Sequence, residues 1–444
     1  HAPPHAAGHA AAFKTHLAKE RCVFLFHAPG ILRSASGGAD ERWVVGINGS
    51  RIMRGHLFKI AVLVFVLILA PFAAHGRDKV FNILYTGAIK GELEPCGCSP
   101  KTESGGLARL SGYISASKGE LEPYVLVDAG NSTGEDTPQG RLKTEALFRS
   151  FNIIGYDAVA LLKRDASLPE EFLSPLIGNY ETPVISENAG HRSFLRAGLE
   201  VNISADPKDY KKGMLNILLI DKPASEATVI KGWEVIVTSS GEIIEEPPKA
   251  DGTIIVSGYP KGKMLGVLSL WINDKGGISG FTHRWQSLGK EIKEDMNVRN
   301  VLNEYDAAVA ALFRDEERKV LSDGSYLGDS NCAACHLPFM EGWKNSRHAG
   351  AFNTLEKAGK SKDPECVKCH TTGYGEEGGF YSVAATPGLM NVQCEACHGP
   401  GKGHAPDFTL PMRPVVESVC LKCHTEDNSP DFDFKRYSEK IKHQ

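Results

Sequence analysis

The pattern Cys-x-x-Cys-His occurs four times between residues 332 and 424. It is typical of covalent c-type haem attachment, because two thiols add across the two vinyl groups of one porphyrin. The histidine after each pair then binds the iron from the near side of the ring. The attaching cysteines are Cys332, Cys335, Cys366, Cys369, Cys394, Cys397, Cys420 and Cys423. The near-side iron ligands are His336, His370, His398 and His424.

Zinc sites and disulfides are the alternative uses of such cysteines. Zinc sites also contain Cys-x-x-Cys, but they do not require a histidine directly after every pair. Eight of the eleven cysteines lie in the four motifs, and this usage indicates cofactor attachment rather than a disulfide framework. The sequence therefore predicts four c-type haems, with iron as the metal.

A haem iron offers a second axial position on the far side of the ring. Nine histidines follow residue 76, and seven of them lie from residue 336 onward. After the four near-side ligands are assigned, His348, His404 and His443 remain in this region. We expect these three to be far-side ligands, because two imidazoles keep the iron six-coordinate and suited to electron transfer.

Three histidines cannot serve four haems. The fourth iron either takes His283 or a methionine, or stays open to a small molecule. An open iron is the leading hypothesis, because it could also perform redox catalysis. The available methionines are Met340, Met390 and Met412.

The N-terminal quarter contains an expected export signal. Residues 53–76 combine basic residues, an apolar run from 60 to 69 and small residues at 73, 74 and 76, which is typical of a signal peptide. The apolar run is short for a membrane span, which needs about 20 residues, so no stable span is expected after cleavage. Residues 1–52 contain no methionine, and we expect them to be a non-native extension upstream of Met53.

The middle of the chain predicts an α/β fold. Apolar, β-branched runs predict strands at 80–86, 124–128 and 158–162, and helical spacing predicts helices at 106–116 and 144–154. The apolar runs in residues 217–271 predict mainly strands. Residues 290–320 predict a helix whose apolar residues recur every three or four positions. We expect this helix to pack on one of the two domains rather than to form a dimer.

Residues 82–116, which contain "NILYTGAIKGELEPCGC" and "GGLARLSGYI", resemble the start of a periplasmic 5′-nucleotidase, a calcineurin-like metallophosphoesterase. "VLVDAGNSTG" and "FNIIGYDAVALLKRD" resemble the second and third metal motifs of that family. The resemblance implies an α/β/β/α sandwich with a two-metal site on loops. The chain departs from the family at these motifs, with Ala88, Lys90, Asn131 and residues 162–165 in place of metal ligands. Phosphoesterase activity is therefore not expected.

Cys96 and Cys98 follow Pro95 in a loop of this domain. They could form a strained disulfide, since such a tight ring fits S–S geometry poorly. They could instead be a redox dithiol that exchanges electrons with the haems, or thiolate ligands of a metal.

The region from Tyr326 onward resembles the tetrahaem cytochromes c that accept electrons from hydroxylamine oxidoreductase. The resemblance rests on "YLGDSNCAACH", "GWKNSRHAGAF", "CEACHGPGKGHA" and "FDFKRYSEKIKH". It implies far-side ligation by His348, His404 and His443, and one five-coordinate haem. It also implies a mainly helical or irregular haem domain.

Together these observations predict a multidomain protein. Residues 77–288 would form the degenerate nucleotidase-like sandwich, 289–325 a helical linker and 326–444 the tetrahaem domain. The expected function is electron transfer in the periplasm or another extracytoplasmic space, with other cytochromes or an oxidoreductase as redox partners. A redox enzyme acting on a small nitrogen or sulfur species is the first alternative, and a phosphoesterase is the second. A net charge of −4 gives no reason to expect a nucleic-acid partner.

Overall fold

The computed structural model describes residues 78–95, 103–316 and 324–442. The described residues all belong to one compact unit, Gly76–Gln444. Residues 1–52, the signal peptide at 53–76, Cys96, Cys98 and His443 lie outside the described residues. The predictions made for them stay predictions.

The first sheet has six strands in the order β12-β11-β1-β2-β3-β4. The apolar run near residue 80 forms its central strand, which pairs in parallel with β2 and antiparallel with β11. All three strands predicted before residue 162 occur in this sheet. Its strands are β1 (Lys79–Thr86), β2 (Tyr124–Asp128), β3 (Ala158–Leu161), β4 (Val184–Ser186), β11 (Met264–Ile272) and β12 (Ile278–Ser287).

The second sheet also has six strands, in the order β5-β6-β7-β8-β10-β9. Its central pairs are parallel, and the two outer strands are antiparallel to their neighbours. Strands β7 and β8 are buried along their whole length and mostly apolar, as expected for strands covered on both faces. The strands are β5 (His191–Arg196), β6 (Leu199–Ser204), β7 (Leu215–Ile220), β8 (Val235–Thr238), β9 (Lys249–Ala250) and β10 (Thr253–Ser257).

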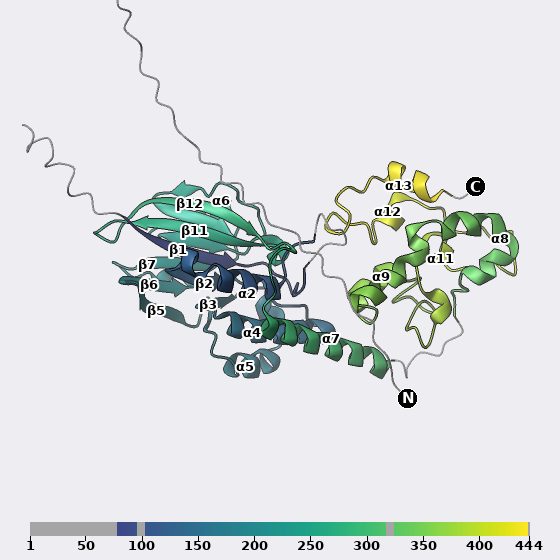
Figure 1. The fold of residues 1–444 in the computed structure, drawn as a ribbon, viewed down its shortest axis with the longest axis horizontal. Coiled ribbons are helices and arrows are strands. Elements are labelled where there is room, and N and C mark those ends of the chain that lie inside the picture. The colour runs from purple at the N-terminus through teal and green to yellow at the C-terminus, as the bar shows by residue number, and fades with distance from the viewer. Residues whose placement is uncertain (1–77, 96–102, 317–323, 443–444) are drawn as a thin grey trace, which may run out of the picture. The chain divides into compact units, whose positions relative to one another are not determined.

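The two sheets pack face to face, with helices on their outer faces (Figure 1). Alternate residues of β1 pack into two different hydrophobic cores. Ile83 faces the core between the two sheets, and Leu84 faces the core under the helices. The outer face of the first sheet is covered by α2 (Leu107–Ala116), α4 (Pro138–Ile154) and α7 (Met296–Glu316). The outer face of the second is covered by α6 (Ala224–Ala227) and Trp233. This arrangement is the α/β/β/α sandwich that the sequence predicted.

Two shorter helices complete the sandwich: α3 (Lys118–Leu121) and α5 (Glu170–Gly178).

Helix α4 begins six residues earlier than predicted. The Thr137 side chain accepts a hydrogen bond from the Gly140 amide at 3.0 Å, and Pro138 occupies the first turn, where its missing N–H costs nothing. The helix ends at Gly155, whose φ of 82° is a left-handed conformation that glycine adopts without strain.

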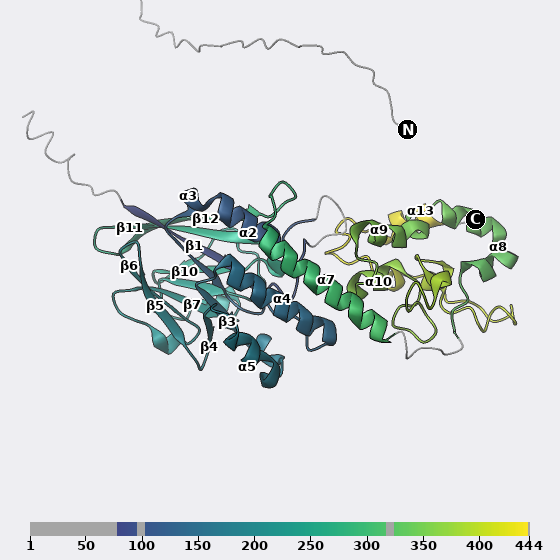
Figure 2. The same ribbon diagram turned by 60° about the horizontal axis from the view of Figure 1, so that its bottom comes forward.

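Helix α7 runs beside α4 (Figure 2). Four residues of the predicted apolar stripe, Val298, Leu302, Tyr305 and Val309, are buried against α2 and α4. The stripe therefore packs on the sandwich, as expected.

The C-terminal region is mainly helical and irregular, as predicted. A small core of six buried residues includes Phe352, Val367 and Phe380. The helices are α8 (Asp329–Lys344), α9 (Ala351–Ala358), α10 (Pro364–His370), α11 (Cys394–His398), α12 (Glu417–Cys420) and α13 (Phe434–Ile441).

Within the part of the chain that the structure describes, no helix is both long and apolar enough to cross a bilayer.

Candidate functional site

Each Cys-x-x-Cys-His motif lies on or beside a short helix. In α10 and α11, residues three and four apart lie on one face of the helix, so both thiols and the following imidazole point to the same side. The third motif is itself the helix α11, and the second ends α10. In α8 the backbone departs from helical geometry at His336, with φ −116° and ψ 34°, two residues before Pro338. The local fold thus presents two thiols and an imidazole together, as haem attachment requires.

The four motifs associate in two pairs. Cys332 of the first motif shares a hydrogen bond with Cys394 of the third, and this bond together with burial raises the pKa of Cys332. Cys369 of the second motif shares one with Cys423 of the fourth. That bond is the main cause that lowers the pKa of Cys369 to about 7. Motifs distant in sequence are therefore neighbours in space.

Two of the three predicted far-side histidines lie opposite near-side histidines of other motifs. The ring centroids of His336 and His404 are 6.3 Å apart, with 21° between the ring planes. Those of His348 and His424 are 6.1 Å apart, with 56° between the planes.

Each of these contacts brings two imidazoles together, and imidazole nitrogen is a ligand that haem iron takes. The donor set therefore fits haem iron at two of the four motifs.

Hydrogen bonds fix the tautomer of several of these rings. Nδ1 of His370 lies 2.7 Å from the Ala351 carbonyl oxygen, and Nδ1 of His404 lies 2.7 Å from that of Leu410. A carbonyl can only accept, so Nδ1–H donates in both cases and Nε2 keeps its lone pair for a metal. Burial lowers the pKa of His348 and of His424, which favours the neutral form that binds iron.

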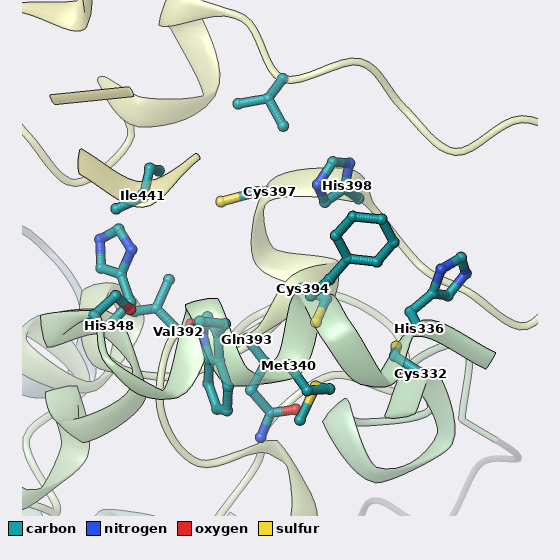
Figure 3. Close-up of a pocket in the computed structure, with 14 residues that line it drawn as sticks. Cys332, His336, Met340, His348, Val392, Gln393, Cys394, Cys397, His398 and Ile441 are labelled. Atoms are coloured by element: carbon teal, nitrogen blue, oxygen red, sulfur yellow. Dashed lines mark hydrogen bonds between the residues drawn. The ribbon is translucent and has the colours of Figure 1, made fainter. Parts of the chain in front are cut away.

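A pocket lies between the first and third motifs (Figure 3). The two sulfurs of the shared Cys332–Cys394 contact border it, and His348 reaches it from the segment after α8. Apolar side chains supply most of the remaining lining, which suits a porphyrin face. The full lining is Cys332, His336, Phe339, Met340, Trp343, Ser346, His348, Val392, Gln393, Cys394, Cys397, His398, Val415 and Ile441.

The second motif differs from the first and fourth in the surroundings of its histidine, His370. Among the residues that the structure describes, no second imidazole contacts His370. Its ring is held by Ala351 and by the hydroxyl of Thr354, at 3.2 Å. His283 does not approach it, because Nε2 of His283 lies 2.7 Å from the Tyr85 hydroxyl within the sandwich.

Two residues around the third motif were not identified from the sequence. Glu395 lies between the two cysteines, is 1% exposed and accepts hydrogen bonds from the amides of Leu327, Gly328 and Gly401 at 2.7–3.0 Å. Gln393 accepts from the Asp329 amide and donates to two carbonyls. They connect the start of α8 to α11. Their neighbours come from distant segments, so the sequence holds no local signal for this role.

In the sandwich, the three segments that resemble metal motifs meet at the carboxyl ends of β1, β2 and β3. The Ala88 amide donates to the Gly130 carbonyl at 2.9 Å, and the Lys90 amide donates to that of Asn131 at 3.1 Å. Asp165 accepts hydrogen bonds from the amides of residues 131, 132 and 133 at 2.7–3.0 Å. This edge of a parallel sheet is the usual position of an α/β site.

The residues at this edge offer few metal ligands. Ala88, Lys90 and Asn131 all have left-handed φ values of 52–55°, a conformation that strains non-glycine residues. The Asn131 side-chain amide donates to Ser239, while its Oδ1 is buried without a partner. Among the described residues, no group of three or more His, Cys, Asp or Glu is arranged to hold a metal ion.

Comparison with known proteins gives different relatives for the two parts. Residues 331–399 match the family described as cytochrome c554 and c-prime. Cytochrome c-554 of Nitrosomonas europaea is 33% identical over 114 residues, which is 22% of this chain and 48% of that protein. The chain thus spans about half the length of this curated relative. The C-terminal resemblance predicted from the sequence is confirmed.

Solved structures similar to the chain have the nucleotidase-like fold. The Thermus thermophilus sulfate thiohydrolase SoxB, in complex with glycerol, is 15% identical with a TM-score of 0.43, covering 56% of this chain and 63% of its own. A 5′-nucleotidase precursor, also from Thermus thermophilus, is 16% identical with a TM-score of 0.48, covering 63% and 68%. The calcineurin-like phosphoesterase YfkN of Bacillus subtilis is 14% identical with a TM-score of 0.44, covering 52% and 98%. The chain spans less than two-thirds of the SoxB chain.

Proposed function

We propose that this protein is an exported electron-transfer protein that carries four covalently attached haems. The observation that supports this most is the pairing of imidazoles, His336 with His404 and His348 with His424, beside the Cys-x-x-Cys motifs; these residues would hold the haem irons. Haem, when bound, supplies a one-electron ferric/ferrous couple. The chain supplies the thioether sulfurs, the axial nitrogens and the hydrogen bonds that orient them.

The close approach of the motifs supports transfer of electrons between haems. The sulfur contacts Cys332–Cys394 and Cys369–Cys423 bring two attachment sites together in each pair. Neighbouring attachment sites favour neighbouring rings, and short distances between rings favour rapid exchange. The resemblance to cytochrome c554 supports redox proteins as partners, and the signal-like segment supports a periplasmic location.

The test of this function is stopped-flow reduction of the holoprotein. After mixing with a soluble reduced cytochrome c or with dithionite, we expect all four haems to be reduced and then reoxidised by ferricyanide. A protein in which the haems cannot be reduced and reoxidised without loss would contradict electron transfer.

We also propose that the sandwich has no hydrolytic activity and serves as a scaffold for the haem region. Charged contacts support the scaffold role: Lys143 of α4 pairs with Glu365 at 2.6 Å, and Lys360 pairs with Asp306 of α7 at 2.6 Å. Glu365 directly precedes the second haem motif, so the contact fixes this motif against α4. The replaced metal-motif residues support inactivity.

Hydrolysis of nucleotides and of p-nitrophenyl phosphate with added Mn²⁺ tests the proposed inactivity. We expect no turnover above that of the Asn131→Ala variant. Turnover that the variant loses would make the sandwich a phosphoesterase.

The dithiol role of Cys96 and Cys98 is a separate proposal, which thiol labelling of the oxidised and reduced holoprotein tests.

A second candidate function is redox catalysis at an open haem. The observation in its favour is that no second imidazole contacts His370 among the described residues. We propose the second motif as the site of the open iron, with the predicted ligand His443 serving the third motif. Electron paramagnetic resonance should show one high-spin ferric haem, and carbon monoxide should bind one ferrous haem per chain. Four low-spin signals and no binding of carbon monoxide would exclude this function.

A further inference from the structure

The residues between the two cysteines of each motif differ in charge from one pair of motifs to the other. The first motif contains two alanines and the third contains Glu395 and an alanine. The second and fourth motifs contain Lys368 and Lys422. We call motifs one and three, joined by the Cys332–Cys394 contact, the acidic pair. Motifs two and four, joined by the Cys369–Cys423 contact, are the basic pair.

Glu395 places a buried carboxylate beside the acidic pair. It is almost completely buried, and its hydrogen-bond donors at 2.7–3.0 Å are the backbone N–H groups of Leu327, Gly328 and Gly401. Donors of this kind stabilise the ionised carboxylate. A buried charge acts through a low dielectric, so its field reaches the neighbouring cofactor with little screening.

Asp329 adds a second carboxylate on the same side. It opens α8, three residues before Cys332, and its backbone amide is anchored by Gln393 at 2.8 Å. Both carboxylates act at the sulfurs that attach the cofactor. After the Cys394 hydrogen bond and burial, they add to the causes that raise the pKa of the Cys332 thiol.

The basic pair carries lysines, and Glu417 is a carboxylate that acts on Cys420 of its fourth motif. Lys368 directly precedes Cys369 in α10, and its side chain is exposed. The nearby carboxylate of Glu365 is paired with Lys143 at 2.6 Å and does not offset Lys368. Lys422 lies 3.6 Å from Glu376, and both of these side chains are exposed, so solvent screens their interaction.

We propose that these charges set the direction of electron flow along the haem array. Negative charge stabilises ferric iron over ferrous iron, so Glu395 and Asp329 hold the acidic pair at the lower reduction potential. The basic pair is then reduced first, and at partial reduction it holds the electrons. Each exchange oxidises one iron of the acidic pair and reduces one iron of the basic pair, and it moves no proton or atom. This inference rests on the proposed attachment of four haems.

Redox titration of the holoprotein with dithionite and ferricyanide, followed by absorbance and electron paramagnetic resonance, tests the proposal. Glu395→Gln should raise the potentials of the lowest-potential haems only. The expected shift is roughly a tenfold change in their ferric/ferrous ratio at a fixed potential, or about 59 mV for one electron. The double variant Lys368→Gln, Lys422→Gln should lower the potentials of the other pair by less, since these lysines are exposed.

The control variants are Glu356→Gln and Lys357→Gln, which remove exposed charges on α9. They should leave all four potentials unchanged. Asp329→Asn provides a second acidic variant, and it decides the outcome if Glu395→Gln does not mature. It should raise the same potentials as Glu395→Gln.

Unchanged potentials in the matured acidic variants, or equal shifts of all four haems, would overturn the proposal. Intact mass of the wild-type protein separates this failure from failure of the proposed function. Four haems with unshifted potentials reject only the charge gradient, whereas fewer than four haems reject its premise.

Discussion

Asp128 is a fully buried carboxyl at the end of β2. Thr86 and Ser132 donate hydroxyl hydrogen bonds to it at 2.6 and 2.7 Å, but burial is the larger effect and raises its pKa to about 7. In the unfolded chain the group titrates near its ordinary value of about 3.9. Between about pH 4 and pH 7 the folded state therefore holds a proton that the unfolded state has lost. This contribution to stability is present at low pH and is lost as the pH rises to about 7.

Asp128→Asn should remove this pH dependence. From pH 5 to pH 8, the free energy of unfolding of the variant should rise relative to wild type by about 2–3 kcal/mol. Urea denaturation at the two pH values, followed by circular dichroism, measures the difference. Parallel pH profiles for the two proteins would show that Asp128 is ionised throughout.

His348 and His404 each carry a specific prediction about one haem. His348→Ala and His404→Ala should each convert one low-spin haem to high spin, because each removes an imidazole that lies opposite a near-side histidine. Electron paramagnetic resonance counts the haems in each spin state, and added imidazole should restore the lost signal. The control His191→Ala, on the edge strand β5, should have no effect. A wild-type spectrum for either ligand variant would remove that residue from the ligand set.

The sequence predicted these histidines but not their partners. The sequence alone shows that this region has more histidines than the four haem motifs contain. The pairings His336–His404 and His348–His424 depend on how distant motifs fold together. The role of Glu395 was missed for the same reason, because its donors come from residues 327, 328 and 401. The iron-ligand roles of His348, His404 and His443 and the redox role of Cys96 and Cys98 remain predictions.

Strands with long apolar runs and helices with a regular apolar stripe were predicted well from the sequence. The central strands β1 and β2 are runs of buried, mostly apolar residues, and the apolar residues of α7 recur at helical spacing. In these elements the apolar pattern of the sequence matches the buried positions. The edge strand β5 was not predicted. Its sequence HRSFLR alternates between exposed and half-buried positions, and its pairing with β6 supplies the hydrogen bonds that define it as a strand.

Leu302 tests the packing of α7 on the sandwich. Its side chain is fully buried against α2 and α4, so Leu302→Ala should lower the free energy of unfolding by about 2–5 kcal/mol. The haem absorption spectrum should not change. Thermal unfolding followed by circular dichroism measures the effect. The control Asn303→Ala removes an exposed side chain and should change stability by less than about 0.5 kcal/mol. Equal effects of the two substitutions would contradict the packing of α7.

At the scale of the whole molecule, the two regions differ in how they are stabilised. The sandwich has two large buried clusters that involve both sheets and three helices. The described part of the haem region has one cluster of six buried residues, and exposed apolar side chains such as Leu337 and Phe408. A porphyrin would cover apolar surface of this kind, so the haem region should depend on its cofactors for stability.

Limited proteolysis of protein made without haem attachment tests this difference. We expect a protected fragment that spans the sandwich and α7, and rapid cleavage after residue 324. The matured holoprotein should resist the same protease in both regions. Equal resistance of the haem region in both preparations would show that it folds without cofactors.

The proposed function depends on four haems covalently attached to the C-terminal region. Intact-mass analysis of the protein from a host that performs cytochrome c maturation tests it most directly. We expect a mass equal to the polypeptide plus four haems, and one haem fewer for each Cys-x-x-Cys pair changed to alanine. A mass equal to the bare polypeptide would contradict it.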